Sequence, residues 1–134
     1  MSVAGSRLLL DTNILIWTIS ASNKISSRAR RALSRPRVSI TVSVVSVWEL
    51  LIKHQAGKLH LHTPLGELLD EILYRSPWKI LPLASEHLPA LAALPALHKD
   101  PFDRLLIAQA LHEDMTIVTA DEQIAQYKVQ TIWQ

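Results

Sequence analysis

The chain has 134 residues, of which 49% are hydrophobic, and it carries a formal net charge of +2 and no cysteine. This length suffices for one hydrophobic core, and no apolar run approaches the roughly 18 residues that would span a bilayer, so a single cytoplasmic domain over residues 1–134 is expected, with no membrane segment. The lack of cysteine excludes disulfides, thiolate nucleophiles and sulfur-bound metals, which leaves oxygen and imidazole as metal ligands.

Strand and helix patterns alternate in the first half of the chain. Apolar and β-branched runs predict strands, whereas segments of helical periodicity follow them, the last of which stops before Gly57. Strands are expected at Arg7–Leu10 and Val38–Val42, and helices at Asn13–Ile19, Ser26–Ser34 and Val44–Gln55.

The second half continues the alternation. Strands are expected at Trp78–Leu83, Met115–Thr119 and Val129–Trp133, and helices at Pro64–Tyr74, from Ser85 to Leu94, from Asp100 onward and from Asp121 onward. Ser85, with Glu86 beside it, can cap its helix, although Pro89 must then lie in the first turn of that helix or break it. Strands that alternate with helices through short loops predict an α/β domain with a mainly parallel central sheet of about five strands and helices on both faces.

Two acidic residues directly follow predicted strands. Asp11 comes after the first strand, and Asp121 comes two residues after the Thr116–Thr119 run. Ligands of open α/β sheets bind beyond the carboxyl ends of the strands, so both acids are placed where a ligand would lie. The alternative for each is a cap for the helix that follows it.

Glu49 is the only charged residue in the apolar segment Val44–Ile52. A carboxylate surrounded by apolar side chains is costly to bury unless a partner or a metal binds it. Alternatively, Glu49 lies on an exposed stripe and pairs with Lys53 one helical turn later.

Asp100 and Asp103 share the first turn of a helix that Pro101 opens. Asp100 is expected to be its N-cap. Asp103 lies at the head of the apolar stripe that includes Leu106 and Ile107, which predicts that it points inward, although a capping role towards Asp100 is the alternative.

Convergence of these segments would place several carboxylates in one cleft. They could not all ionise there without a cation, and hard oxygen ligands select Mg²⁺ or Mn²⁺. Such a site suits phosphodiester hydrolysis by metal-activated water. His60 and His62, at alternate positions in a connector, are expected on the surface rather than on zinc.

Basic residues are concentrated in the first third of the chain. Between Met1 and Trp48 there are seven of them against one acidic residue. This excess is either an ordinary solvated surface or a contact area for phosphates, and in the second case Arg28, Arg30 and Arg31 would hold RNA.

Four strings of the sequence resemble the PIN-domain family, in particular the VapC-type toxins of bacterial toxin–antitoxin pairs. They are Leu9–Asn13, Val47–Leu50, His98–Ala110 and Ile117–Asp121, in the right order and over nearly the whole chain. The resemblance implies a PIN-like α/β/α sandwich with the activity of a Mg²⁺-dependent endoribonuclease, usually a homodimer, which a cognate antitoxin holds inactive. Its RNA target would be tRNA or ribosomal RNA.

Carried over by position, the resemblance makes Asp11 and Asp103 the principal metal ligands, with Glu49 and Asp121 completing the acidic cluster. Asn13 and Thr119 match supporting polar positions. The main alternative is a catalytically inactive PIN-fold module that binds RNA or an antitoxin. Haloacid-dehalogenase chemistry is disfavoured, since it needs a second aspartate where Asn13 stands.

Overall fold

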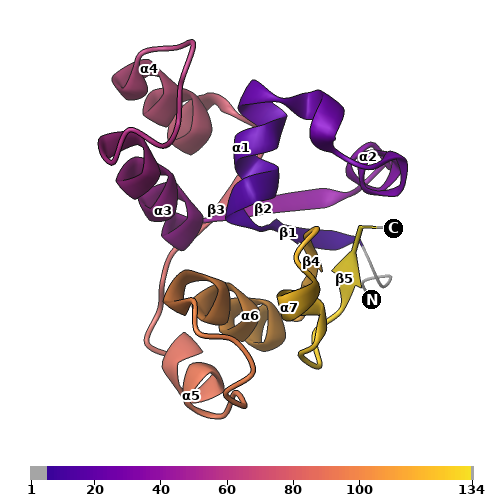
Figure 1. The fold of residues 1–134 in the computed structure, drawn as a ribbon. Helices are drawn as coiled ribbons and strands as arrows, with labels where there is room; N and C mark the ends of the chain where they lie inside the picture. The colour runs from indigo at the N-terminus through magenta and orange to yellow at the C-terminus, as the bar shows by residue number, and fades with distance from the viewer. Residues whose placement is uncertain (1–5, 134) are drawn as a thin grey trace.

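A five-stranded sheet forms the centre of the computed structural model, which describes residues 6–133, and every pairing in this sheet is parallel. The strands are β1 (Arg7–Leu10), β2 (Ser39–Ser43), β3 (Lys79–Leu81), β4 (Thr116–Val118) and β5 (Thr131–Ile132). Their spatial order is β3-β2-β1-β4-β5 (Figure 1). The prediction of an α/β fold with about five mainly parallel strands is confirmed.

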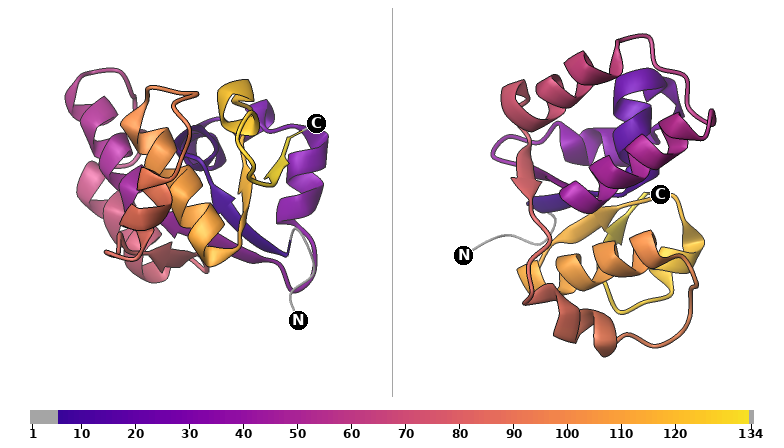
Figure 2. Two further views of the ribbon diagram at one scale, coloured as in Figure 1. Left: turned by 90° about the horizontal axis from the view of Figure 1, so that it is seen from below. Right: turned by 90° about the vertical axis from the view of Figure 1, so that its left-hand side faces the viewer.

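Helices cover both faces of the sheet, as the right-hand view of Figure 2 shows. One face carries α1 (Thr12–Ser20), α2 (Ser27–Leu33), α3 (Val44–Gln55) and α4 (Leu65–Asp70), and the other carries α5 (His87–Ala92), α6 (Pro101–Glu113) and α7 (Glu122–Ala125). The expected α/β/α sandwich is therefore present. None of the helices within residues 6–133 is long and apolar enough to cross a membrane.

The alternation of side chains along β1 builds a separate core on each face. Leu8 and Leu10 belong to the core beneath α1–α4, whereas Leu9 belongs to the core beneath α6 and α7. All three leucines are fully buried, because successive residues of a strand point to opposite faces and both faces are covered. The unbroken apolar run before Asp11 is thus the mark of a central strand.

The strand order reverses direction beside β1. From β1 the chain moves outward to β2 and β3, then returns to form β4 and β5 on the other side. Connections that leave two adjacent parallel strands in opposite directions open a crevice at their carboxyl ends. The residues that follow β1 and β4 meet there, and the Asp11 amide donates to the Val118 carbonyl at 3.2 Å.

A buried polar contact ties α3 to α6. The Ser43 hydroxyl caps α3 by accepting from the Val45 amide at 3.0 Å, and it donates to Oε1 of Gln109 at 2.6 Å. Gln109 is fully buried on α6, and its Nε2 donates to the Pro82 carbonyl at 3.3 Å. The two helices that carry Glu49 and Asp103 are thereby fixed to one another.

The cap expected from Ser85 is wrong. α5 begins at His87, its N-cap residue is Glu86, and no side chain caps it. The buried His87 imidazole organises the turn instead: Nδ1 accepts from the Ala84 amide at 3.0 Å, and Nε2 lies 2.9 Å from Glu113. His87, two residues after Ser85 and in contact with Glu113 of α6, thus takes the place of the Ser85 hydroxyl in this turn.

Other boundaries also differ from those expected. The helix expected at Pro64–Tyr74 divides into α4 and a π-helical turn η2 (Glu71–Arg75), and a short 3₁₀ helix η1 (Ser22–Lys24) was not expected. The strands expected at Trp78–Leu83 and Val129–Trp133 are shorter than predicted. The apolar residues that flank these two edge strands pack on the core without pairing with a neighbouring strand. The apolar pattern is therefore longer than the hydrogen-bonded strand.

Replacing Gln109 with leucine should lower the free energy of unfolding by about 2 kcal/mol, because it leaves the buried Ser43 hydroxyl and the Pro82 carbonyl without their partner. Urea denaturation followed by circular dichroism measures this. Gln126→Leu, at an exposed position, is the matched control and should change stability by less than about 0.5 kcal/mol. Equal stability of the two variants would show that the Ser43–Gln109 contact contributes nothing.

Candidate functional site

A polar pocket of about 210 Å³ lies at the carboxyl ends of β1 and β4. It is lined by Asp11, Thr12, Asn13, Glu49, Lys53, His98, Asp100, Asp103, Asp121 and Gln123. All four carboxylates singled out from the sequence are therefore in one place, although they come from four separate segments. A larger cavity of about 490 Å³ lies elsewhere, beside α5, and its lining includes no carboxylate.

Asp11 combines a structural contact with a place in the pocket. Its Oδ1 accepts from the Ile14 amide at 2.8 Å, so it is the N-cap of α1. Its Oδ2 accepts from the Thr119 hydroxyl, which comes from the end of β4. The residue is 4% exposed. Asp11 is thus the cap that the alternative interpretation required, and capping also fixes the carboxylate that lines the pocket; its role towards a ligand stays a prediction.

Glu49 reaches the pocket from the middle of α3. Its Oε1 accepts from the Thr12 hydroxyl at 2.6 Å, and its Oε2 lies 3.4 Å from Nζ of Lys53. The residue is only 9% exposed, so it does not lie on an open helix surface. The pairing with Lys53 that the alternative interpretation required is nevertheless present.

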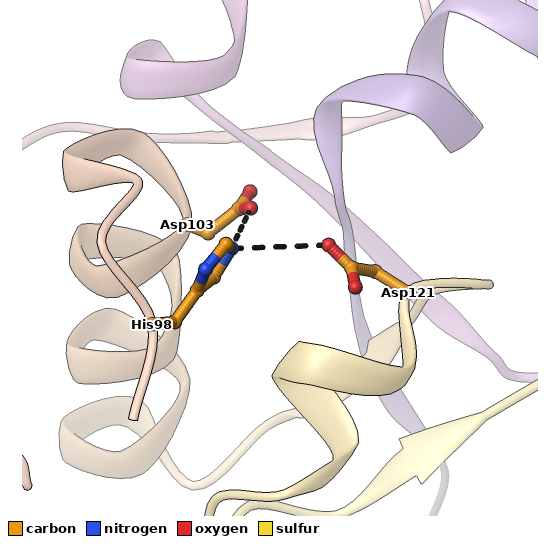
Figure 3. Close-up of side chains that lie close together, drawn as sticks. All are labelled: His98, Asp103 and Asp121. Carbon is orange, nitrogen blue, oxygen red and sulfur yellow. Dashed lines mark hydrogen bonds and ion pairs between the residues drawn. The ribbon is translucent and has the colours of Figure 1, made fainter. Parts of the chain in front are cut away.

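A histidine links two of the carboxylates (Figure 3). Nε2 of His98 lies 2.8 Å from Oδ2 of Asp103 and 3.9 Å from Oδ2 of Asp121. One ligand atom from each of the three residues lies within 4.8 Å of the others. Asp103 points inward from the first turn of α6, as expected, while Asp100 is the N-cap of that helix. Asp121 caps α7 with its other oxygen.

The supporting residues also lie at this site. Thr119 is buried, donates to Asp11 and accepts from the Asp121 amide at 3.0 Å, so one hydroxyl orients two acids. Asn13 lines the pocket at its exposed side and accepts from Lys53 at 3.4 Å.

Arg28, Arg30 and Arg31 lie away from the pocket. None of them lines it, and α2 packs instead near β5 at the edge of the sheet (Figure 1). Arg30 donates to the carbonyls of Ser22 and Ile25. Their role in holding RNA stays a prediction.

Sequence reasoning did not assign His98, Thr12 or Lys53 to the site. His98 stands five residues before Asp103 in a loop, where no periodicity places it. Thr12 was visible only as part of the Asp-Thr-Asn string, and Lys53 only as a surface partner of Glu49. Each of the three lies close in sequence to one of the acids, and this proximity was the signal available for finding them.

Residues 8–130 match the family model of the PIN domain. The chain belongs to the PIN domain family. PIN domains are generally nucleases and are typically dependent on a divalent metal. No curated protein sequence matches the chain.

Solved structures share the fold of this PIN domain. A chain of the VapBC2 structure from Rickettsia felis, bound to a DNA fragment from its promoter, is 19% identical over 96% of this chain and 99% of that one, with a TM-score of 0.71. A chain of FitAcB from Neisseria gonorrhoeae is 21% identical over 93% of this chain and 96% of that one, with a TM-score of 0.67. A chain of VapBC-1 from nontypeable Haemophilus influenzae is 17% identical over 94% of this chain and 96% of that one, with a TM-score of 0.65. At such identities the likeness shows the fold alone.

Burial raises the pKa of Asp11 to about 6. The hydrogen bonds from Thr119 and Ile14 oppose this rise, and the negative charges of Asp103 and Asp121 add to it. The carboxylate is thus placed where it ionises with difficulty, unless positive charge is supplied nearby.

The pKa of Asp103 is also raised to about 6, first by burial. The hydrogen bond with His98 opposes the rise, whereas the charges of Asp100 and Glu49 strengthen it. Mutual repulsion therefore links the acids of this PIN domain across the pocket.

The donor set fits a hard divalent cation. Carboxylate oxygens are the ligands that Mg²⁺ and Mn²⁺ prefer, and the pocket also offers one imidazole and no thiolate. Burial is the main cause of the two raised pKa values, and a bound cation would offset both this cost of ionisation and the repulsion that adds to it. Asp11, Glu49, Asp103 and Asp121 are the residues that could hold it.

In metal-free protein, Asp11→Asn and Asp103→Asn should each raise the free energy of unfolding by about 1–2 kcal/mol near pH 7.5. The folded-state pKa values, about 6, lie above the ordinary value of 3.8. Ionisation of each group therefore lowers the free energy of unfolding as the pH rises from about 4 to 6. The gain should shrink as the pH falls and vanish below about pH 3, where the carboxyls are protonated in both states.

Chemical denaturation in EDTA at several pH values measures these gains. Asp114→Asn is the control, because Asp114 is an exposed residue in the left-handed region, which asparagine also adopts. Destabilisation by both pocket variants at pH 7.5 would contradict the account of repelling carboxylates.

Proposed function

We propose that this PIN domain is a Mg²⁺-dependent endoribonuclease, with Mn²⁺ as a substitute, which hydrolyses RNA phosphodiester bonds and acts as the toxin of a toxin–antitoxin pair. The observation that carries the proposal is the convergence of four carboxylates from four separate segments in one polar pocket. Structural caps alone would not require these acids to share a pocket, where burial, with added repulsion from neighbouring acids, raises the pKa values of Asp11 and Asp103.

Asp11 and Asp103 are the principal metal ligands in this proposal, and Glu49 and Asp121 complete the acidic cluster. When bound, the cation would supply an activated water as nucleophile and charge stabilisation for the phosphate. No serine or cysteine nucleophile is then needed.

The chain's own residues hold this arrangement in place. The hydroxyls of Thr119 and Thr12 donate to Asp11 and Glu49, so each carboxylate has one oxygen fixed from a neighbouring segment. His98 holds Asp103 from the loop before α6 and faces Asp121. Rigid orientation of ligands by such contacts is how proteins keep a metal site ready for its ion.

The toxin assignment draws on the proteins that share the fold. They include VapBC-1, VapBC2 and a toxin–antitoxin complex from Klebsiella pneumoniae. We therefore propose a cognate antitoxin protein as partner, a homodimer as the active form, and tRNA or ribosomal RNA as substrate.

The second candidate is a catalytically inactive PIN-fold module that binds RNA or an antitoxin. Helix capping by Asp11 and Asp121 is the observation in its favour, because these acids would be retained for stability without any metal.

Cleavage of total cellular RNA by the purified, antitoxin-free protein tests the proposal. Discrete fragments should form with Mg²⁺ or Mn²⁺, and EDTA should abolish them. Asp103→Asn should reduce the rate by at least about 100-fold, because loss of one charged ligand weakens the metal site.

Asp114→Asn serves as the control for this assay, since Asp114 ends α6 at its far end from the pocket. Cleavage that persists in EDTA, or in folded Asp103→Asn, would contradict the metal-dependent mechanism. No cleavage by folded wild-type protein with either metal would favour the binding module.

A further inference from the structure

Lys53 is the only lysine or arginine among the residues that line the acidic pocket. It lies on α3, one turn after Glu49, and its side chain is 32% exposed. The clustered arginines of α2, which the sequence had suggested for RNA, do not line the pocket. The positive charge nearest to the carboxylates is therefore a residue that sequence reasoning treated as a surface partner.

The contacts of Lys53 do not engage all the hydrogen-bond donors of its ammonium group. Nζ lies 3.4 Å from Oε2 of Glu49 and donates to Oδ1 of Asn13 at 3.4 Å. Both distances are long for a hydrogen bond, whose usual length is about 2.9 Å. An ammonium group has three donors, and within residues 6–133 only these two acceptors engage it. At least one donor remains for a ligand.

The charge of the pocket favours such a donor for an anionic substrate. Five carboxylates line it, those of Asp11, Glu49, Asp100, Asp103 and Asp121. A cation held by some of them offsets only part of this charge, so a phosphate that enters the pocket still meets net repulsion. An ammonium group at the partly exposed side of the pocket, with a free donor, is the group that can contact the phosphate directly.

We propose that Lys53 binds a non-bridging phosphate oxygen of the substrate strand at the acidic pocket. The inference rests on the proposed function for the identity of the strand as RNA. In the absence of substrate, Lys53 pairs loosely with Glu49 and Asn13, and these contacts are exchanged for the phosphate when the strand binds. The competing explanation is a purely structural one, in which Lys53 only holds Glu49 in position.

The two explanations predict opposite effects on metal binding. If Lys53 serves the phosphate, Lys53→Gln removes a positive charge beside the carboxylates, so Mn²⁺ should bind as tightly as before or several-fold more tightly. If Lys53 only positions Glu49, the same substitution should weaken Mn²⁺ binding. Isothermal titration calorimetry with MnCl₂ and no RNA separates these outcomes.

RNA binding supplies the second readout. Fluorescence anisotropy of a labelled, mixed-sequence single-stranded RNA is measured in an Asp103→Asn background, which prevents cleavage. Lys53→Gln should weaken binding about ten-fold and flatten the dependence of log affinity on log salt by about 0.7, the share of one phosphate contact on a single strand. Lys53→Arg, which keeps the charge, should restore most of the affinity.

Lys58→Gln is the matched control, because Lys58 is an exposed lysine just beyond the end of α3 and does not line the pocket. Three results would each overturn the inference. They are equal RNA affinity and salt slope in the Lys53 and Lys58 variants, weaker Mn²⁺ binding in Lys53→Gln, and no RNA binding by any variant. Lys53-dependent RNA binding by a wild-type protein that cleaves no RNA would leave the inference standing while the proposed nuclease activity fails.

Discussion

The burial of several mutually repelling carboxylates in one pocket is the constraint on which the rest of this structure depends. Asp11 and Asp103 both have pKa values raised to about 6, and in each case burial is the largest cause, with neighbouring acids adding to it. A fold gains nothing in stability from gathering such groups. Their convergence at the point where the strand order reverses fits the proposed metal site, since a cation there would turn an unfavourable cluster into a binding site.

The surrounding structure limits this cost without removing it. Asp11 and Asp121 each accept from a backbone amide at the start of a helix. The Thr119 hydroxyl also donates to the Asp11 carboxylate and accepts from the Asp121 amide. Amides at helix starts carry partial positive charge, which favours a carboxylate. The buried Ser43–Gln109 contact keeps α3 and α6, and with them Glu49 and Asp103, in a fixed relation. Stability contacts and functional contacts thus meet on the same side chains.

Local patterns predicted the fold and the four acids, but long-range contacts decided the rest. The apolar run Leu8–Leu10 marked the central strand, and acids after strands marked the pocket, because both follow from the geometry of parallel sheets. The cap of α5 failed because His87, held by Glu113 from α6, replaced Ser85. His98 was missed for a similar reason, since a loop residue is placed by what it contacts in space. The sequence offered burial of Glu49 and its pairing with Lys53 as alternatives, but they do not exclude one another, and both are present.

The central claim is that the acidic pocket holds a divalent metal ion, and an anomalous-difference map from a crystal soaked in MnCl₂ tests it most directly. The account predicts a strong peak in the pocket at about 2.1–2.2 Å from carboxylate oxygens of Asp11 and Asp103, with its other ligands drawn from Glu49, Asp121 or water. Absence of a peak in the pocket, with manganese bound only at carboxylates elsewhere on the surface, would contradict it.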